Sequence, residues 1–113
     1  MAKVQISVVI PVYNEEANLA ALMSRLIPVM KYMGKSFEII LIDDGSKDNS
    51  LKLLKEFVSN PFVKVVELTK NYGQHAAIMA GFSVVHGDMV ITMDADLQNP
   101  PEEIPNLISV MEK

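Results

Sequence analysis

The chain has 113 residues, half of them hydrophobic, and carries a formal net charge of −4 with no cysteine. This length suits one small domain with an ample core, and the negative charge gives no electrostatic basis for binding nucleic acid or an anionic membrane. The absence of cysteine excludes disulfides and thiolate zinc sites, and no apolar run reaches the roughly 18 residues of a membrane-spanning helix, so we expect this chain to be cytoplasmic.

The first third of the chain predicts a buried strand followed by a helix. Residues 6–12 are β-branched and almost continuously apolar, which is typical of a central parallel strand buried on both faces. Asn14 is a predicted N-cap for the helix, and apolar residues then recur at helical spacing as far as Met33. We expect Pro28 to kink or split this helix and Gly34 to end it.

Two further strands are predicted in the middle of the chain. Residues 37–42 form the second apolar segment, and the Asp-Asp-Gly-Ser turn after it places Ser46 as the N-cap of a helix near residues 51–58. Residues 63–68 form the third segment, in which Lys64 indicates a position nearer the edge of the sheet.

The last third predicts a helix, a strand with an acidic end and a final helix. Residues 76–85 are apolar nearly all round, so we expect neighbours to cover this helix on more than one side. The strand that begins at Met89 ends in Asp94 and Asp96, and the final helix starts within residues 99–103. The apolar face of that helix is expected to consist of Leu107, Ile108 and Met111.

This alternation of strands and helices, without a repeat or a linker, predicts a single α/β domain over residues 1–113. We expect a Rossmann-like, mainly parallel sheet with strand order 3-2-1-4, right-handed crossovers and helices on both faces. The order reverses between the first and fourth strands, and open α/β sheets bind ligands at such a point, outside the carboxyl ends of the strands. Residues 13–15 and 94–96 are therefore predicted to lie side by side in a candidate site.

The acidic strand end offers the donor atoms of a hard-metal site. In extended geometry alternate residues share a face, so Asp94, Asp96 and Gln98 can point to one side. Oxygen donors of this kind suit Mg²⁺ or Mn²⁺. Taken alone, an Asp-x-Asp sequence is so common that a solvated acidic turn is the better interpretation, and the rest of the chain has to decide between the two.

The turn after the first strand excludes two common ways of binding phosphate. Neither the glycine-rich dinucleotide-binding motif nor a Walker motif is present, and Glu15 and Glu16 oppose phosphate binding at this helix start. A bound diphosphate would therefore need a metal ion, which the Asp-x-Asp segment can hold.

Several residues near the predicted strand ends have both a functional and a structural interpretation. Tyr13 can stack on a base or pack against the sheet, and Asp44 can accept a pyrimidine ring N–H or cap its own turn. Asn71 and Gly73 can contact ribose or base, or simply form a polar loop. For His75 we favour a capping or surface position.

Three blocks of sequence, residues 7–15, 43–48 and 94–96, resemble the nucleotide-binding half of inverting family 2 glycosyltransferases with the GT-A fold. Residues 71–82 and 94–105 give a narrower resemblance, to the polyprenyl-phosphate glycosyltransferases. Together the blocks span essentially the whole chain, and they stand in the family's order at the ends of the expected strands.

The resemblance implies transfer of a sugar, with inversion, from a UDP-sugar to a polyprenyl phosphate such as undecaprenyl phosphate, in the synthesis of lipopolysaccharide for the cell envelope. It implies that Asp94 and Asp96 are catalytic and that, with Gln98, they bind Mg²⁺ or Mn²⁺. The nucleotide-binding residues that it implies are Pro11, Tyr13, Glu15, Asp44, Asn71 and Asp94. A phosphate monoester is largely ionised at neutral pH, since its second pKa is about 6, so no protein general base is expected.

The same resemblance implies sequence beyond these residues. Family members carry an acceptor-side half and the lipid-phosphate enzymes usually add membrane helices, so we expect this chain to be the N-terminal part of a protein at the cytoplasmic face of the bacterial inner membrane. Alone, it is expected to bind nucleotide and metal without catalysing transfer. Its fourth strand would form an apolar edge of the sheet, which predicts a homo-oligomer.

Three other functions stay open at this point. A transferase of the same family can use a saccharide acceptor instead. A receiver-like signalling module also binds Mg²⁺ at strand ends, but its acidic pair follows the first strand, where this chain has Pro-Val-Tyr-Asn-Glu. A nucleotidyltransferase needs a glycine-rich loop at the same place, and this sequence has none.

Overall fold

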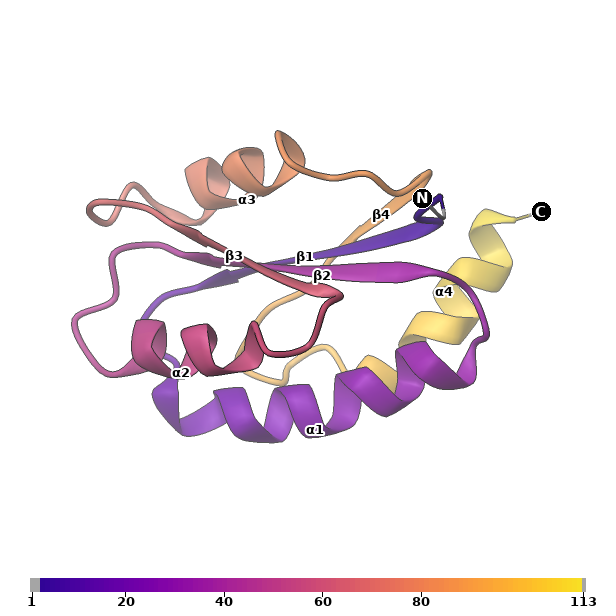
Figure 1. Cartoon of the computed structure of the whole chain (residues 1–113), viewed down its shortest axis with the longest axis horizontal. Coiled ribbons are helices and arrows are strands. Elements are labelled where there is room, and N and C mark those ends of the chain that lie inside the picture. Colours follow the sequence, from indigo (N-terminus) through magenta and orange to yellow (C-terminus); the bar gives the residue numbers. More distant parts are fainter. Residues whose placement is uncertain (1–2, 113) are drawn as a thin grey trace.

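The computed structural model describes residues 3–112, which form a parallel sheet with strand order β3-β2-β1-β4 and helices on both faces (Figure 1). The predicted α/β class and strand order are thereby confirmed. The elements in chain order are β1 (Ile6–Val12), α1 (Glu16–Tyr32), β2 (Phe37–Asp43), α2 (Ser50–Phe57), β3 (Val63–Glu67), α3 (Gln74–Phe82), β4 (Met89–Thr92), the 3₁₀ helix η1 (Pro101–Glu103) and α4 (Ile104–Met111).

The strand register sets where the chain leaves the sheet. β1 pairs with β2 along its whole length but with β4 only as far as the pair Val9 and Thr92. One more backbone bond, from Met93 N–H to the carbonyl of Val9 (3.1 Å), carries the chain just past the end of β4. The acidic segment that follows therefore runs beside the last residues of β1, at the carboxyl edge of the sheet.

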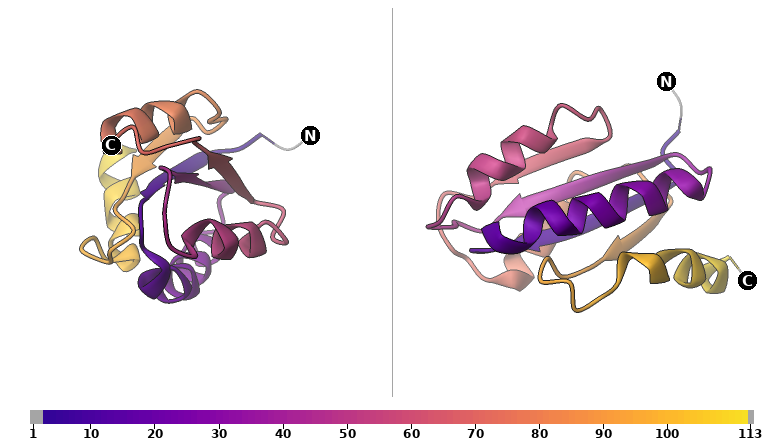
Figure 2. Two further views of the ribbon diagram at one scale, coloured as in Figure 1. Left: turned by 90° about the vertical axis from the view of Figure 1, so that its left-hand side faces the viewer. Right: turned by 90° about the horizontal axis from the view of Figure 1, so that it is seen from below.

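Most of the core lies between the sheet and the layer formed by α1, α2 and α4. Alternate residues of the central strands, such as Ile10 and Leu41, point into this layer. The residues between them, such as Val9 and Ile40, point to the opposite face, where Ala77 of α3 packs on them. Figure 2 shows α3 alone on that side. The prediction that β1 is buried on both faces is confirmed.

Helix α3 lies unusually close to the sheet. A Cβ atom at Gly81 would come within 2.6 Å of Val9 Cγ1 and 2.8 Å of Ile42 Cδ1, so a larger residue there would require the helix or these side chains to move. We expected neighbouring elements to cover this helix on more than one side. For the described residues that expectation is wrong, because Met79 and Phe82 on the outer side of the helix are 52% and 41% exposed. No neighbouring helix in residues 3–112 shares this face of the sheet.

Two predicted helix caps are wrong, because both residues form hydrogen bonds between two loops. Neither Asn14 nor Ser46 precedes a helix directly, since α1 begins at Glu16 and α2 at Ser50. Instead, Asn14 N–H donates to Ser46 Oγ (3.0 Å), and Asn14 Oδ1 accepts the N–H of Lys47 (2.8 Å). These residues join two loops at the carboxyl edge of the sheet.

The helix starts are held by Asp48, a residue that propensity does not single out. Its Oδ1 accepts the N–H of Ser50 (2.9 Å) and its Oδ2 that of Glu16 (3.3 Å), so it serves both α1 and α2. Burial raises the pKa of Asp48, but the hydrogen bonds from Ser50 and Glu16 outweigh it and lower the pKa below its ordinary value.

The other helix expectations gave mixed results. α1 continues past Pro28 without a break and is followed by Gly34, whose φ of 71° favours glycine, as expected for a helix end. In α4 the buried residues are Ile104 and Ile108, one turn apart, whereas Leu107 is 47% exposed. The predicted apolar face of this helix is therefore wrong except for Ile108.

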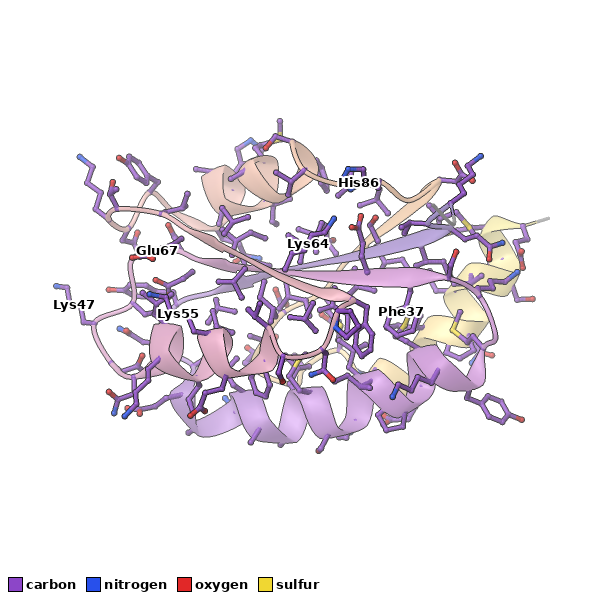
Figure 3. All side chains as sticks on the ribbon, in the orientation of Figure 1. Phe37, Lys47, Lys55, Lys64, Glu67 and His86 are labelled. Atoms are coloured by element: carbon purple, nitrogen blue, oxygen red, sulfur yellow. The ribbon has the colours of Figure 1, made fainter. Side chains whose placement is uncertain are left out.

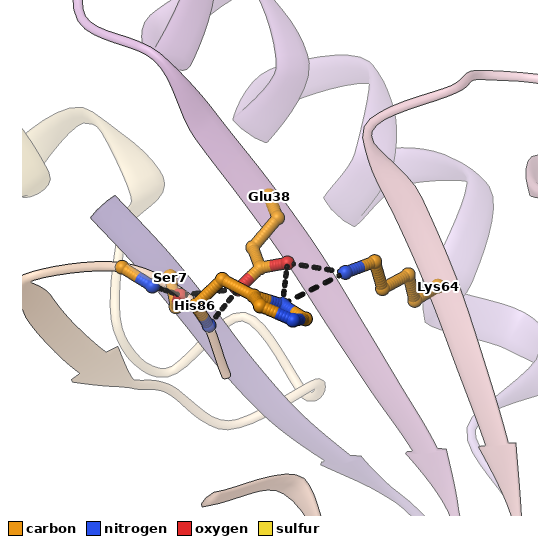
Figure 4. Close-up of polar contacts among 5 residues, drawn as sticks. Ser7, Glu38, Lys64 and His86 are labelled. Atoms are coloured by element: carbon orange, nitrogen blue, oxygen red, sulfur yellow. Dashed lines mark hydrogen bonds and ion pairs between the residues drawn. The ribbon is translucent and has the colours of Figure 1, made fainter. Parts of the chain in front are cut away.

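A buried carboxylate ties the strands together away from the candidate site (Figures 3 and 4). Glu38 of β2 is only 2% exposed, and its carboxylate accepts hydrogen bonds from Ser7 Oγ (2.6 Å), Lys64 Nζ (2.8 Å) and the backbone N–H of His86 (2.6 Å). Gly87 N–H in turn donates to Ser7 Oγ (2.8 Å). The cluster thus connects β1, β2 and β3 to the loop that leads into β4.

Candidate functional site

A pocket of about 380 Å³ opens at the carboxyl ends of β1, β2 and β4, where the strand order reverses. Every residue that the sequence nominated lines it: Pro11, Tyr13, Glu15, Asp44, Asn71, Asp94, Asp96 and Gln98. The remaining lining residues are Val12, Gly73, Gln74 and Ala95. The expected proximity of residues 13–15 and 94–96 is therefore present, while the roles of these side chains stay predictions.

The end of β1 presents an aromatic ring and a carboxylate to the pocket. Tyr13 is 38% exposed, which leaves ring surface accessible for stacking. Glu15 is fixed at both its backbone and its side chain: its N–H donates to Ser50 Oγ (2.8 Å), and its Oε2 accepts from Asn18 Nδ2 (2.8 Å). This wall of the pocket is thus held by the first turns of both α1 and α2.

Asp44 is the carboxylate at the end of β2 that faces the pocket. It is 3% exposed, and its two oxygens accept the backbone N–H groups of Tyr72 (2.8 Å) and Gly73 (3.1 Å). A carboxylate has about four lone-pair positions, so each oxygen can still accept a further hydrogen bond. Asp43 does not line the pocket; it is also buried, and its Oδ1 has no partner within residues 3–112.

Asn71 reaches the pocket because two loops pack backbone to backbone. Gly45 has a φ of 72°, and a Cβ atom there would lie 2.4 Å from both the backbone N of Asn71 and the carbonyl C of Lys70. A side chain at this position would push the loop away. The glycine of the Asp-Asp-Gly-Ser turn is thus required by this close approach as well as by its dihedral angle.

The acidic segment does not have the extended geometry that the sequence argument assumed. β4 ends at Thr92, and the chain turns at residues 95–96 before passing through Leu97 with a φ of 67°. The N–H of Gln98 then donates to Asp96 Oδ1 (3.1 Å), which closes the turn. Gln98 therefore reaches the pocket through a turn and not by alternation along a strand, although all three proposed oxygen donors still line one pocket.

Gln74 is a pocket residue that the sequence argument missed. It is the first residue of α3, and its Nε2 donates to Asp94 Oδ1 (3.1 Å) across 20 residues of sequence. The backbone N–H of Asp94 donates to Asn99 Oδ1 (3.4 Å). The only signal in the sequence was the position of Gln74 in a polar connection ahead of an apolar helix.

The donor set fits a hard divalent cation whose coordination sphere is completed by a bound ligand. Within residues 3–112, no three His, Asp or Glu side chains come close enough to hold a metal by themselves. Asp94 and Asp96 provide two carboxylates and Gln98 an amide oxygen, all on the same pocket. Mg²⁺ is commonly bound by one or two carboxylates together with substrate phosphates and water, and this set matches that pattern.

Comparison with known proteins agrees with this geometry. The model of the family "Glycosyl transferase family 2" matches residues 7–113. The chain is 56% identical over 110 residues to the undecaprenyl-phosphate 4-deoxy-4-formamido-L-arabinose transferase of Shewanella sediminis, covering 96% of this chain and 33% of that protein. The protein of the same name from Edwardsiella ictaluri is 54% identical, with 34% of its length covered. The chain therefore spans about a third of the curated relatives it matches.

Solved structures show the same fold. The mannosyltransferase PcManGT from Pyrobaculum calidifontis, in complex with GDP-Man and Mn²⁺, superimposes with a TM-score of 0.83 at 20% identity, over 100% of this chain and 34% of that one. Glucosyl-3-phosphoglycerate synthase from Mycobacterium tuberculosis, in complex with Mn²⁺, UDP and phosphoglyceric acid, gives a TM-score of 0.75 at 26% identity, over 95% and 38%.

Proposed function

The chain belongs to glycosyl transferase family 2, and from that membership we propose that it is the donor-binding part of an enzyme that transfers a sugar, with inversion, from a UDP-sugar to a polyprenyl phosphate. The observation that carries the proposal is the single pocket in which an aromatic ring, a buried carboxylate and a pair of acidic residues meet at the reversal of the strand order. The relatives named above support the choice of acceptor.

The uridine moiety fits the end of the pocket formed by Tyr13, Asp44 and Asn71. The half-exposed ring of Tyr13 offers a stacking surface, and Asp44 offers carboxylate oxygens that are fixed by two backbone N–H groups. Uracil carries an N–H on its ring where cytosine carries a lone pair. A fixed carboxylate accepts a hydrogen bond from the first and repels the second.

We assign the diphosphate to the part of the pocket lined by Asp94 and Asp96. A divalent cation held by these carboxylates and by Gln98 would neutralise the charge that develops on the UDP leaving group. Without it, the same carboxylates would repel a diphosphate. The proposed metal dependence follows from this charge balance.

The acceptor supplies its own nucleophile. A phosphate monoester oxygen attacks the anomeric carbon of the sugar, and the bond from that carbon to the UDP oxygen breaks on the opposite face, which inverts the configuration. The second pKa of such a phosphate is about 6, so it attacks as an anion at neutral pH. No residue of the pocket has to remove a proton.

We further propose that the whole protein works at the cytoplasmic face of the bacterial inner membrane, in lipopolysaccharide synthesis, and that this chain alone binds donor without transferring sugar. Among residues 3–112, no helix is long and apolar enough to span a bilayer. Contact with the membrane and with the lipid acceptor would then belong to other parts of the whole protein.

The donor preference is tested by competition. Bound UDP would be displaced from the 113-residue chain, in the presence of Mn²⁺, by unlabelled UDP, CDP or GDP. We expect UDP to compete at least 10-fold better than CDP, since one lost hydrogen bond to a charged group is worth roughly 1.5–3 kcal/mol. Equal competition by CDP, or stronger competition by GDP, would contradict the assignment of a uridine donor.

The acceptor is tested with the whole protein. Its incubation with UDP-sugars and either undecaprenyl phosphate or a soluble oligosaccharide should give a glycosylated lipid phosphate and no glycosylated saccharide. Transfer only to the saccharide would favour the other acceptor class within the same family.

A further inference from the structure

Gln74 makes a contact that the proposed function does not use. Its side-chain amide donates to Asp94 Oδ1 at 3.1 Å, and this is the only side-chain hydrogen bond to the Asp94 carboxylate within residues 3–112. The contact joins the start of α3 to the segment after β4, and both residues line the pocket. One oxygen of Asp94 is thereby engaged, and Oδ2 is left for another partner.

The backbone of Gln74 is fixed from both sides. Before it, Asp44 binds the N–H groups of Tyr72 and Gly73 with its two oxygens. After it, Ala77 N–H donates to the carbonyl of Gly73 (3.0 Å), which closes the first turn of α3. Gly73 itself has a φ of 101°, which brings the loop into the helix at an angle that other residues rarely adopt. The side chain of Gln74 therefore extends from a backbone position that is held on both sides.

We infer that Gln74 is a positioning residue for metal binding, which orients the Asp94 carboxylate so that its free oxygen faces the cation. The inference rests on the metal role proposed for Asp94. An unrestrained aspartate on a turn must give up rotamer freedom when it binds a metal, and a hydrogen bond that is already present reduces that cost. Partners of this kind typically contribute 10- to 100-fold to metal affinity. Because Gln74 is exposed, we expect the lower end of that range.

The test compares three forms of the 113-residue chain: the wild type, Gln74→Met and His75→Ala. Methionine keeps the length of the side chain but cannot donate a hydrogen bond, and His75 is the exposed neighbour that does not line the pocket. Mn²⁺ affinity in the presence of UDP is measured by electron paramagnetic resonance. UDP affinity at saturating Mn²⁺ and the melting temperature are measured in parallel.

We expect Gln74→Met to weaken Mn²⁺ binding about 10-fold while its UDP affinity at saturating Mn²⁺ and its melting temperature match the wild type. His75→Ala should leave all three unchanged. Unchanged Mn²⁺ affinity in Gln74→Met would overturn the inference, and so would an equal loss of UDP affinity at saturating Mn²⁺, which would make Gln74 a nucleotide contact.

A failure of the proposed function gives a different result. If Mn²⁺ does not bind the wild type with UDP present, or binds equally well to Asp96→Asn, the metal site itself is wrong and the positioning role falls with it. If the wild type binds Mn²⁺ and Asp96→Asn does not, the comparison of Gln74→Met with the wild type alone decides the inference.

Discussion

Glu38 is a buried acid whose ionisation we expect to stabilise this fold. Burial by itself raises its pKa, but the hydrogen bonds from Lys64, Ser7 and the backbone of His86 outweigh burial and lower the pKa to about 2, from an ordinary value of 4.5. The carboxylate thus stays charged in the folded protein at pH values where it is protonated in the unfolded chain.

The sign of the pH effect follows from that depressed pKa. The stabilisation is fully present above pH 4.5 and is lost as the pH falls from 4.5 towards 2. Between pH 5 and pH 3 this group alone should cost the wild type about 2 kcal/mol of unfolding free energy. Urea denaturation at the two pH values measures the loss. Glu38→Gln should show a loss smaller by that amount, and the same loss in both proteins would contradict the account.

The residues that were nominated from the sequence and those that were missed differ in how far away along the sequence their partners lie. Asp94 and Asp96 were nominated from their place at the end of a predicted strand and from the family resemblance of the surrounding blocks, and both line the pocket. Gln74 was missed because its partner Asp94 lies 20 residues away, and the bond from Asp48 to α1 was missed because Glu16 lies 32 residues away, on a segment that meets it only in the folded chain. Asn14 was assigned a local cap, and a long-range contact with the loop at Ser46 displaced that role.

At the scale of elements, α3 depends on one glycine. Gly81 lets the helix lie directly on Val9 and Ile42 of the sheet. An added methyl group must displace either the helix or the side chains of Val9 and Ile42, and both of these side chains are buried in the central strands. The position of α3 matters for the pocket because its first residue, Gln74, lines it.

Gly81→Ala should therefore destabilise the chain by about 1–3 kcal/mol, despite the better helix propensity of alanine. Met79→Ala, two residues earlier and 52% exposed, is the control and should stay within about 0.5 kcal/mol of the wild type. Both values come from urea denaturation. Equal stability of the two variants would mean that the helix does not pack as closely as described.

Elements in which the apolar residues form one clear pattern were predicted well, and elements with an ambiguous pattern were not. β1 matches its predicted range, and β2 and β3 differ from theirs by one residue each. The failures lie where one pattern allows two arrangements. α4 has more apolar residues than its buried face holds, so the sequence alone could not tell that Ile104 and Ile108 are buried and Leu107 is not.

The whole molecule leaves one edge of its sheet apolar and unpaired within residues 3–112. β4 is an edge strand, and a groove of about 460 Å³ lies between it and α4. Leu107, Val110 and Met111 on α4 are each about half exposed or more. Such an edge promotes association with another chain.

We therefore expect the 113-residue chain to form dimers or larger assemblies. Light scattering at several concentrations measures its mass, and the double variant Leu107→Lys/Val110→Lys should shift the population towards monomer, because it places charges beside the groove. Lys52→Glu on α2 changes charge at a surface away from that groove and serves as the control. A monodisperse wild-type monomer would refute the expectation.

The topology was the most predictable level of this protein. A strict alternation of strands and helices allows few parallel arrangements, and the strand order 3-2-1-4 was among them. Once the order is known, the position of the pocket follows from it. Its detailed shape could not be foreseen, since it depends on left-handed residues such as Leu97 and on bonds between distant loops.

The central claim is that Asp94 and Asp96 hold a divalent cation through which a uridine diphosphate binds. Titration of the 113-residue chain with UDP by isothermal calorimetry, with and without Mn²⁺, tests it most directly. We predict weak binding that requires Mn²⁺ and that Asp96→Asn abolishes. Binding of equal strength without metal, or no binding in either condition, would contradict the claim.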